Sequence, residues 1–481
     1  MNTPRFPKHP LTTVAELAML SLSVLVSTGC SSSTERSLDT TGERPGSLAE
    51  KASACRPGPG PQARQLDRRT RLYVPPEGPA AQQADRYREA GELEKAALMD
   101  AMAAEPQVVY LAVGDLDEMQ ERVRTTIRQA RRQHQLPVFA AYDIPGRDCS
   151  QYSGGGANTE PEYRTWIDAL AAAIGRNHAV VLIEPDGVAL LPSEPWCGVA
   201  GGGFTGEPED LERVRERFRE LRYAVGRLGS LPQVDVYLDA GHSAWHPFND
   251  YDAYYGEPQL QFGIVHRLLL AGVGHAAGFF LNPSNNRSTE KLITYGARIA
   301  KCVALLQSDP DFVLPEIYAP DVVYDEEGRF SSPCPPEEEL DAMPLTPRAA
   351  RRMPHFVIDT SRNGQGPWNL GDADTTNDDG VAFAEIYGYE TTDPEIWCNT
   401  PGRGVGPRPT TRTGHPLVDA FLWIKVPGES DGQCGRNLVA PDPSWPANYD
   451  VAWDQVDPPA GQWFEAQALE LARLADPPLL P

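Results

Sequence analysis

The chain has 481 residues, of which 41% are hydrophobic and 23% charged, as in a globular protein with a sizeable core. Its formal net charge of −24 argues against nucleic acid or an anionic membrane as partner, because binding to phosphates needs a basic face. The length suits either two or three average domains or one barrel domain of about 400 residues with long loops.

Residues 1–29 have the pattern of an export signal. Arg5 and Lys8 precede an apolar stretch, 17–26, that is too short to span a bilayer. The sequence Ser-Thr-Gly-Cys that ends at Cys30 resembles a bacterial lipoprotein cleavage site, with Cys30 as the lipidated first residue. Ser27 stands where such sites prefer Leu, so simple cleavage and release is the alternative. We expect export from a bacterial cell, followed by lipid anchoring at the envelope or secretion.

The remaining chain divides into a linker and one folded domain. Residues 30–65 are rich in Ser, Gly, Pro and charge, which predicts a flexible linker. Residues 66–481 carry the apolar periodicity of a folded domain. Two long stretches rich in Pro and acidic residues, 309–353 and 428–461, interrupt it; we interpret the first as an insertion that could remodel one wall of a cleft.

Seven short apolar runs alternate with helical segments in the folded domain. The expected strands are 108–113, 137–143, 179–186, 234–239, 278–282, 355–359 and 421–425. The expected helices are 84–104, 115–133, 160–176, 207–228, 259–270, 289–306 and 465–475. This alternation predicts an α/β fold with a parallel sheet, and seven strands favour a closed barrel over an open sheet. No Gly-rich phosphate turn follows the first strand, so no nucleotide site is expected.

Polar side chains stand at the ends of these apolar runs. They are Asp115, Asp143, Glu184, Asp186, Asp239, Asn282, Asp359 and Lys425. The carboxyl ends of the strands in a parallel barrel meet at one mouth, so these groups are expected to gather there. A ring of acids predicts acid–base chemistry on a neutral substrate.

Asp186 is the sharpest candidate in this ring. It follows the strand Val-Val-Leu-Ile-Glu-Pro, so its carboxyl group emerges beside a hydrophobic wall. Lost solvation raises the pKa of a carboxyl group, which a general acid at neutral pH needs. The alternative is an aspartate that caps the start of a helix, and the local sequence does not decide between the two.

The segment Tyr142–Cys149 supplies a second acid, Asp148. The neighbouring Arg147 is expected to keep Asp148 ionised, which would separate the two acids in role. A surface Arg–Asp pair is the alternative. The glycines after Ser153 suit a loop that closes over a ligand, or an ordinary flexible loop.

Loops after later strands carry aromatic and charged residues. His242 is more simply read as a hydrogen-bonded structural residue than as a catalyst. Trp245, Trp368 and Trp397 suit stacking on sugar rings, with ordinary core packing as the alternative. The segment 425–432 adds Lys425 and a third acid, Asp431.

The sequence shows no nucleophile elbow and no motif for a metal or cofactor. Several acids beside aromatic platforms, without such motifs, point to glycoside hydrolysis, which uses two carboxyl groups in different protonation states.

The eight cysteines form no CxxC pair or Cys/His cluster, so we interpret them as disulfides of an exported chain. The pairing we favour is Cys149–Cys197, Cys398–Cys434 and Cys302–Cys334. Cys30 and Cys55 are then the two cysteines outside these pairs. Spacing alone does not prove this connectivity.

Together the motifs resemble glycoside hydrolase family 6, the inverting cellulases. The matching strings are YDIPGRDC, IEPD, YLDAGH, LNPSN, DTSRNGQGPW, WCNTPGRGVGPRP and DAFLWIKVPGESDG, and they run in the family's order. The resemblance implies a distorted seven-stranded β/α barrel acting on β-1,4-glucan, without a cofactor. It also implies the first two disulfides named above.

The resemblance assigns roles to single residues. Asp186 would be the general acid, and Asp148 would raise the pKa of Asp186. Tyr142 would distort the reacting sugar, Ser153 would hold the attacking water, and Asp431 matches the family's disputed base. Substrate-contacting or supporting positions are Asp239, His242, Trp245, Asn282, Arg362, Trp397, Lys425 and Glu429.

We interpret the chain as an endoglucanase, because the segment 148–163 is short and Cys434 follows Asp431 closely. We also expect a monomer. A cellobiohydrolase is the alternative, because the segment 435–462 is long enough to cover a cleft. A glucan-binding protein without catalytic activity is a further alternative.

Overall fold

The computed structural model describes residues 65–112, 114–149, 151–192, 197, 208–246, 263–309, 334–366, 397–435, 444–446, 448–450 and 452–481. The predicted signal, Cys30, Cys55, nearly all of the predicted linker and Trp368 lie outside this part. The described residues all belong to one compact unit, Pro57–Pro481.

Seven parallel strands form the central sheet in sequence order, which confirms the predicted α/β fold. They are β1 (Val109–Leu111), β2 (Val138–Ala141), β3 (Ala179–Ile183), β4 (Val234–Asp239), β5 (Gly278–Leu281), β6 (His355–Asp359) and β7 (Val418–Leu422). The seventh strand begins three residues earlier than predicted. The charged Asp419 interrupts the apolar pattern at this start. It is nevertheless buried in the strand, because its carboxylate accepts from the Tyr237 hydroxyl at 2.7 Å and is hydrogen-bonded to the ring of His355 at 2.7 Å.

The sheet curls without the full closure that the sequence suggested. Within the described residues, β7 pairs in a ladder with β6 and β1 with β2, and the order ends at these two strands. A backbone hydrogen bond, from the Val108 N–H to the Trp423 carbonyl at 3.3 Å, joins the two edges. The result is a distorted barrel.

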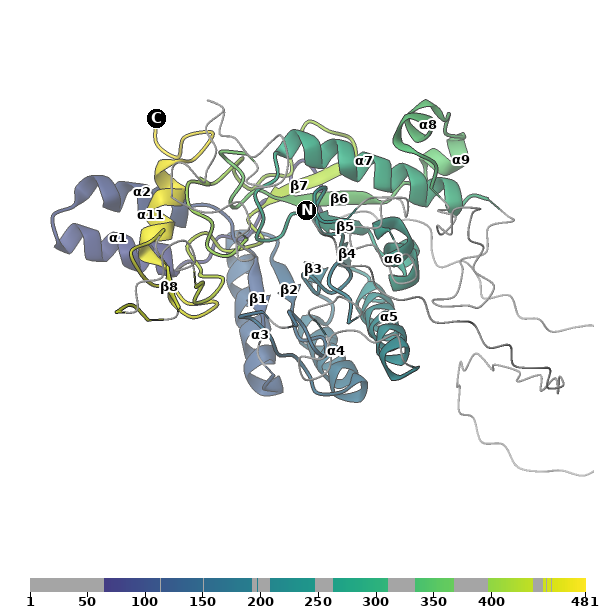
Figure 1. Cartoon of the computed structure of the whole chain (residues 1–481), viewed down its shortest axis with the longest axis horizontal. Coiled ribbons are helices and arrows are strands. Elements are labelled where there is room, and N and C mark those ends of the chain that lie inside the picture. Colours follow the sequence, from purple (N-terminus) through teal and green to yellow (C-terminus); the bar gives the residue numbers. More distant parts are fainter. Residues whose placement is uncertain are drawn as a thin grey trace, which may run out of the picture. The chain divides into compact units, whose positions relative to one another are not determined.

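Helices cover the outer face of the sheet, as Figure 1 shows. They are α3 (Leu116–Gln133), α4 (Glu160–Ile174), α5 (Pro208–Gly229), α6 (Ile264–Ala271), the short η2 (Val273–His275) and α7 (Thr289–Leu306). Alternate strand residues divide between two cores. Phe139, Val181 and Phe279 pack against the helices, whereas Leu182 and Phe280 fill the inside of the barrel. Each such side chain contributes about 1.5–3 kcal/mol when fully buried.

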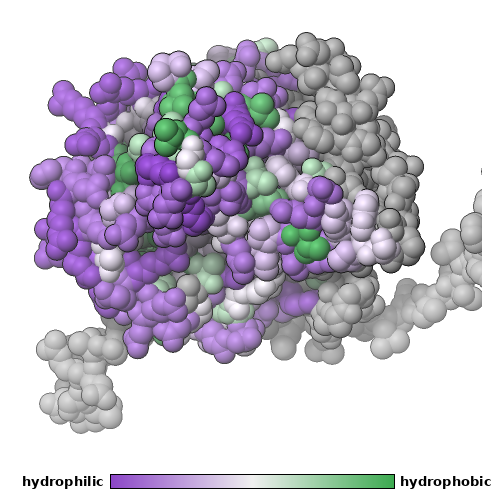
Figure 2. Space-filling model, turned by 90° about the vertical axis from the view of Figure 1, so that its left-hand side faces the viewer, coloured by the Kyte–Doolittle hydropathy of each residue, from purple (hydrophilic) through white to green (hydrophobic). Residues whose placement is uncertain are grey.

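The predicted helix 84–104 is two helices, α1 (Pro79–Glu89) and α2 (Leu93–Ala103). Gly91 separates them with a φ of +78°, a conformation that ends a helix and favours glycine. Both pack with α11 (Glu465–Arg473) in a third hydrophobic cluster that includes Trp423. The surface on this side of the molecule is mostly hydrophilic, with small separated hydrophobic patches (Figure 2).

The described end of the predicted insertion packs on the outside of the barrel. It forms α8 (Glu337–Ala342) and α9 (Pro347–Ala350), beside α7 (Figure 1). The Cys302–Cys334 disulfide and hydrogen bonds from Arg298 to Glu337 and Asp341 attach α8 to α7. The insertion therefore contacts a helix here rather than a cleft wall.

A small hairpin, β8 (Tyr449–Asp450) with β9 (Gln455–Val456), precedes α11. Its Trp453 indole N–H donates to the Asn399 carbonyl at 2.8 Å. In the part of the chain that the structure describes, no helix has the length and apolar character needed to cross a membrane.

Candidate active site

The loop after β2 carries Tyr142, Asp148 and Ser153. Asp148 has a positive φ of +47°, and one oxygen of its half-buried carboxyl group accepts the Ser153 N–H at 2.9 Å. Burial and the nearby charges of Asp148 and Asp186 raise the pKa of the buried Tyr142 hydroxyl. These three predicted residues therefore lie in one site.

The charge of Arg147 acts on the pKa of Asp148 in the lowering direction that the sequence suggested, but it is not the largest effect. Its guanidinium lies 4.8 Å from the Tyr142 ring centre and donates to the carbonyls of Tyr142 and Ser153. Burial outweighs the attraction of this cation, so the pKa of Asp148 is raised. The net direction is set by burial, and the guanidinium also shapes the loop through its bonds to the two carbonyls.

The loop after β3 places Asp186 in the same site. Its φ is +68°, and a hydrogen-bonded turn rather than a helix follows it, so the helix-cap alternative does not hold. Burial, then the charges of Asp239 and Asp148, raise the pKa of Asp186 well above its ordinary value. Lys425 opposes this effect more weakly. The environment favours a proton-carrying Asp186 near neutral pH.

Asp239 and its neighbours form the wall beside Asp186. Burial raises the pKa of Asp239 to about 7, although backbone N–H groups oppose it; Gly241 donates at 3.0 Å. His242 is buried with its pKa lowered, and its Nδ1 accepts the Ala244 N–H at 3.3 Å, which fits the structural interpretation. Trp245 is half-buried and its ring stacks on His246 at 4.8 Å.

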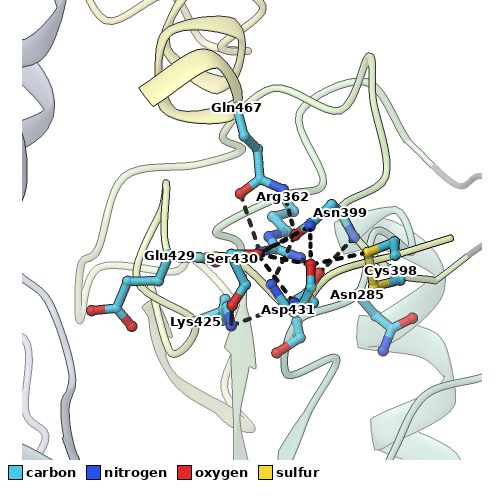
Figure 3. Close-up of polar contacts among 12 residues, drawn as sticks. Asn285, Arg362, Cys398, Asn399, Lys425, Glu429, Ser430, Asp431 and Gln467 are labelled. Carbon is cyan, nitrogen blue, oxygen red and sulfur yellow. Dashed lines mark hydrogen bonds and ion pairs between the residues drawn. A yellow bond between two sulfur atoms is a disulfide. The ribbon is translucent and has the colours of Figure 1, made fainter. Parts of the chain in front are cut away.

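Asp431 lies in the opposite electrostatic environment (Figure 3). Its carboxylate accepts hydrogen bonds from the Arg362 guanidinium and, at 2.9 Å, from the Asn399 N–H. It also forms an ion pair with the Lys425 ammonium at 3.1 Å. These contacts overcome the effect of burial and lower the pKa of Asp431 to about 2. Asp431 is therefore ionised throughout the physiological range.

Three further predicted residues surround this cluster. Glu429 points away from Asp431 in Figure 3, and burial raises its pKa. Trp397 is half-buried, with its ring centre 6.3 Å from that of the exposed Tyr152. Asn282 differs, because its amide donates to the carbonyls of Asn285 and Asp359 and its oxygen accepts the Arg287 N–H. Asn282 is thus committed to holding a loop.

Two acids of the predicted ring have structural positions. Asp115 is exposed and caps α3, accepting the Glu118 N–H at 2.9 Å. Asp359 is buried and accepts backbone N–H groups from three loops, those of Ser284, Ser361, Ile424 and Lys425. Asp359 therefore fastens the ends of β5, β6 and β7 rather than offering a free carboxylate.

All three preferred disulfides are present in the structure: Cys149–Cys197, Cys302–Cys334 and Cys398–Cys434. The Cys149 and Cys398 bridges adjoin Asp148 and Asn399. Cys434 also converges with the buried Asp450 and Asp457, a possible set of metal ligands. Its sulfur is already bonded to Cys398, and Asp457 accepts the Asn399 amide at 2.7 Å, so this group has a structural character.

The sequence reasoning missed three residues of the site. Burial, then the nearby charges of Asp359 and Asp186, raise the pKa of Tyr110. Asn399 bonds both the backbone and the carboxylate of Asp431. Arg217 binds the loops behind Asp148 and Asp186. Its position in α5 gave a signal, because it falls on the apolar face marked by Val214 and Leu221.

The family described as glycosyl hydrolases family 6 matches residues 67–475. The chain belongs to this family. This match confirms the resemblance found in the sequence.

Relatives within the family carry two kinds of name. Over 79% of this chain, the sequence is 28% identical to Endoglucanase A of Cellulomonas fimi. Over 71% of this chain, it is 29% identical to the probable 1,4-beta-D-glucan cellobiohydrolase C of Aspergillus fumigatus. It spans 56% and 62% of these two proteins.

The fold also resembles solved structures of the family. The endoglucanase Cel6 of Mycobacterium tuberculosis, solved with a thio-linked methyl cellobiosyl-cellobioside, is 30% identical with a TM-score of 0.55, covering 84% of this chain and 97% of that one. A cellobiohydrolase Cel6A of Humicola insolens, at 21% identity and a TM-score of 0.54, covers 87% and 100% and shares the fold.

Proposed function

We propose that the chain hydrolyses β-1,4-glucosidic bonds of cellulose or a related β-glucan, with inversion at the anomeric carbon. The observation that carries this proposal is the contrast between Asp186 and Asp431 in one site. Burial and neighbouring acids stabilise the proton on Asp186, whereas Arg362, Lys425 and Asn399 hold Asp431 ionised. Glycoside hydrolysis needs such a pair of acids in different protonation states.

Asp186 would protonate the glycosidic oxygen as the bond to the anomeric carbon breaks. The positive charge that develops on the sugar ring would be stabilised by the negative site, in which Asp431 is a permanent charge. Tyr142 lies among Asp148 and Asp186, where its ring would press on the reacting sugar. Water would attack the opposite face of that sugar.

The attacking water would be held by the loop that contains Asp148 and Ser153. The Ser153 N–H fixes the Asp148 carboxyl group, so both side chains are available at a defined place. The proton that leaves the water would pass to a carboxylate of the site, directly or through a second water. Trp245 and Trp397 offer half-buried rings for stacking of further glucose units.

The substrate proposal is supported by the Mycobacterium tuberculosis relative, whose structure contains a cello-oligosaccharide analogue. We favour internal cleavage by an endoglucanase, as the short loop at 148–163 suggests. Named relatives include both endoglucanases and cellobiohydrolases. On carboxymethylcellulose, an endoglucanase lowers viscosity early relative to the sugar released. Release of cellobiose without a fall in viscosity would favour the cellobiohydrolase.

The acid assignment is tested with Asp186→Ala on a long β-glucan. General acid catalysis contributes about 10²–10⁴-fold, so we expect a loss of that size with the fold retained. Activity equal to that of the native protein would refute the assignment. Proton NMR of the new chain end should show the α-anomer first, as inversion requires. A chain that binds cello-oligosaccharide and releases no product would be the non-catalytic glucan-binding alternative.

Export and lipid modification of Cys30 remain proposals, since Cys30 lies outside the described residues. The three disulfides support export to an oxidising compartment. A Cys30→Ser variant should lose membrane association and radiolabelled fatty acid. Equal membrane association of both forms would contradict lipidation. The monomeric state is likewise a proposal, which light scattering would test.

A further inference from the structure

A buried arginine on α5 connects two loops of the site. Arg217 is only 3% exposed, and its Nη1 donates to the carbonyls of Gly187 and Leu190 at 3.1 and 3.0 Å. Its Nη2 donates to the carbonyl of Pro145 at 2.8 Å. Gly187 directly follows Asp186, and Pro145 lies three residues before Asp148. One guanidinium therefore binds the loop of each acid.

Glu184 is a second side chain that links the same two loops. It directly follows β3, two residues before Asp186, and its carboxyl group accepts the Asp143 N–H at 2.9 Å and the Ile144 N–H at 3.1 Å. The charge of Glu184 also acts on Arg217. Two buried side chains, Arg217 and Glu184, thus bind the backbone of the Asp148 loop.

Burial of the charged Arg217 side chain between these loops costs free energy. It stands on the apolar face of α5 among Phe218 and Leu221, where a hydrophobic side chain would avoid desolvation of a cation. Its nearest carboxylate, Glu220, lies 3.8 Å away, and its Nε has no acceptor among the described residues. Backbone carbonyls are therefore its main partners, which ties its presence to the geometry of the loops.

We propose that Arg217 is a positioning residue that sets the separation of the Asp148 and Asp186 carboxyl groups. The inference rests on the proposed function, in which Asp186 is the acid. Coulomb energy falls with distance, so this separation decides how strongly Asp148 opposes ionisation of Asp186. If the loops part, Asp186 ionises at lower pH and donates its proton over a narrower range.

Charged and titratable groups surround both residues. Asp186 faces Asp239, Asp148, Asp431 and Lys425. Arg217 faces Glu220 on α5, Glu184 after β3, and the hydroxyls of Tyr163 and Tyr142. Removal of the arginine charge would itself change these ionisations. The informative substitution is therefore Arg217→Lys, which keeps the charge and loses the planar fork that reaches carbonyls of two loops.

The test measures kcat and KM against pH for the full chain on a soluble β-glucan. For Arg217→Lys we expect kcat per folded molecule to fall about 10- to 100-fold, as for a small misplacement of reacting groups. The basic limb of the kcat profile should move to lower pH, while KM stays near that of the native protein.

Arg222→Lys is the matched control. Arg222 lies on the same helix and its Nη1 also donates to a backbone carbonyl, that of Leu270, at 2.7 Å. Leu270 belongs to α6 and neither acid's loop is involved. This control should lower the melting temperature without moving the basic limb. A role of Arg217 in folding alone would make its variant behave in the same way.

Glu184→Asp provides a second variant if Arg217→Lys does not fold. Its shortened side chain loses reach to the Asp143 and Ile144 N–H groups, so the basic limb should again move to lower pH. An unmoved limb and native kcat per folded molecule, in whichever variant folds, would overturn the proposal. If Asp186→Ala is inactive and Arg217→Lys has native kinetics, only this inference is refuted. If Asp186→Ala is active, the proposed function is refuted.

Discussion

At the scale of single residues, two aspartates of this site have pKa values shifted in opposite directions. Asp186 and Asp431 are both aspartates that follow strands of one sheet. Asp186 has backbone turns, apolar neighbours and other acids around it, and its pKa rises. Asp431 has a guanidinium, an ammonium and a backbone N–H within hydrogen-bond distance, and its pKa falls to about 2. Partners, not residue type, decide which one carries a proton.

This environment makes Asp431 a poor direct base. A base works best with a pKa near the working pH, and a carboxylate with a pKa of about 2 binds a proton weakly. The pKa of Asp148 is raised instead, so Asp148 is the better candidate for the group whose protonation stops activity in acid. We therefore assign charge stabilisation to Asp431.

The variants Asp148→Asn and Asp431→Asn separate these roles. The acidic limb of the kcat/KM profile should move in Asp148→Asn and stay in place in Asp431→Asn. The second variant leaves the buried Arg362 without its carboxylate, so it should also lose about 3–5 kcal/mol of unfolding free energy. The opposite result would be that added azide restores the activity of Asp431→Asn and that the kcat/KM profile of this variant loses its acidic limb. This result would show that Asp431 is the base.

At the scale of elements, disulfide bridges hold irregular segments of the chain in place. The Cys302–Cys334 bridge ties α7 to the segment before α8, and the Cys398–Cys434 bridge ties two loops beside Asp431. The first lies on the outside of the barrel, and the second adjoins the cluster in Figure 3. Disulfides of similar loop length thus have different relations to function.

The double variant Cys302→Ala/Cys334→Ala tests this difference. The bridge closes a loop of 32 residues, and its loss should lower the free energy of unfolding by about 2–4 kcal/mol in chemical denaturation. The value of kcat should stay unchanged, because α8 packs against α7 on the outside of the barrel. The control Cys398→Ala/Cys434→Ala should lose both stability and kcat. A large fall in kcat in the first variant would contradict an outer, structural role for α8 and α9.

At the scale of the whole molecule, several buried acids of the described residues have raised pKa values. Burial raises the pKa of five carboxyl groups to between about 6 and about 8: Asp143, Glu184, Glu220, Asp239 and Asp359. The unfolded chain releases these protons near pH 4, so the folded chain binds more protons between pH 4 and 8. Stability from these groups therefore falls as the pH rises through this window.

Thermal unfolding should show this dependence directly. We expect a higher melting temperature at pH 5 than at pH 8, and the net charge of −24 acts in the same direction. Asp431 acts oppositely, because its lowered pKa gives stability that is lost only as the pH falls from about 4 to about 2. Measurements in high salt reduce the surface contribution. An equal or higher melting temperature at pH 8 in high salt would contradict the prediction.

Much of the fold was readable from the chain, because apolar runs and helical periodicity report local burial. Four kinds of detail escaped this reading. The charged Asp419 lies near the start of β7, and Gly91 divides one expected helix into two. Asp115 caps a helix, and Arg147 bonds the carbonyls of its own loop. In each case a polar or flexible residue found its partner through geometry that periodicity does not encode.

The sequence by itself determined the parallel α/β architecture, the family and the acids that approach one barrel mouth, because strand patterns and motif strings are local and ordered along the chain. Only the tertiary structure decided which acid is protonated, that the sheet stays incompletely closed, and that Arg217 reaches two loops. These properties depend on groups far apart in the sequence, and electrostatic and hydrogen-bond energies depend on distances that only the folded chain sets.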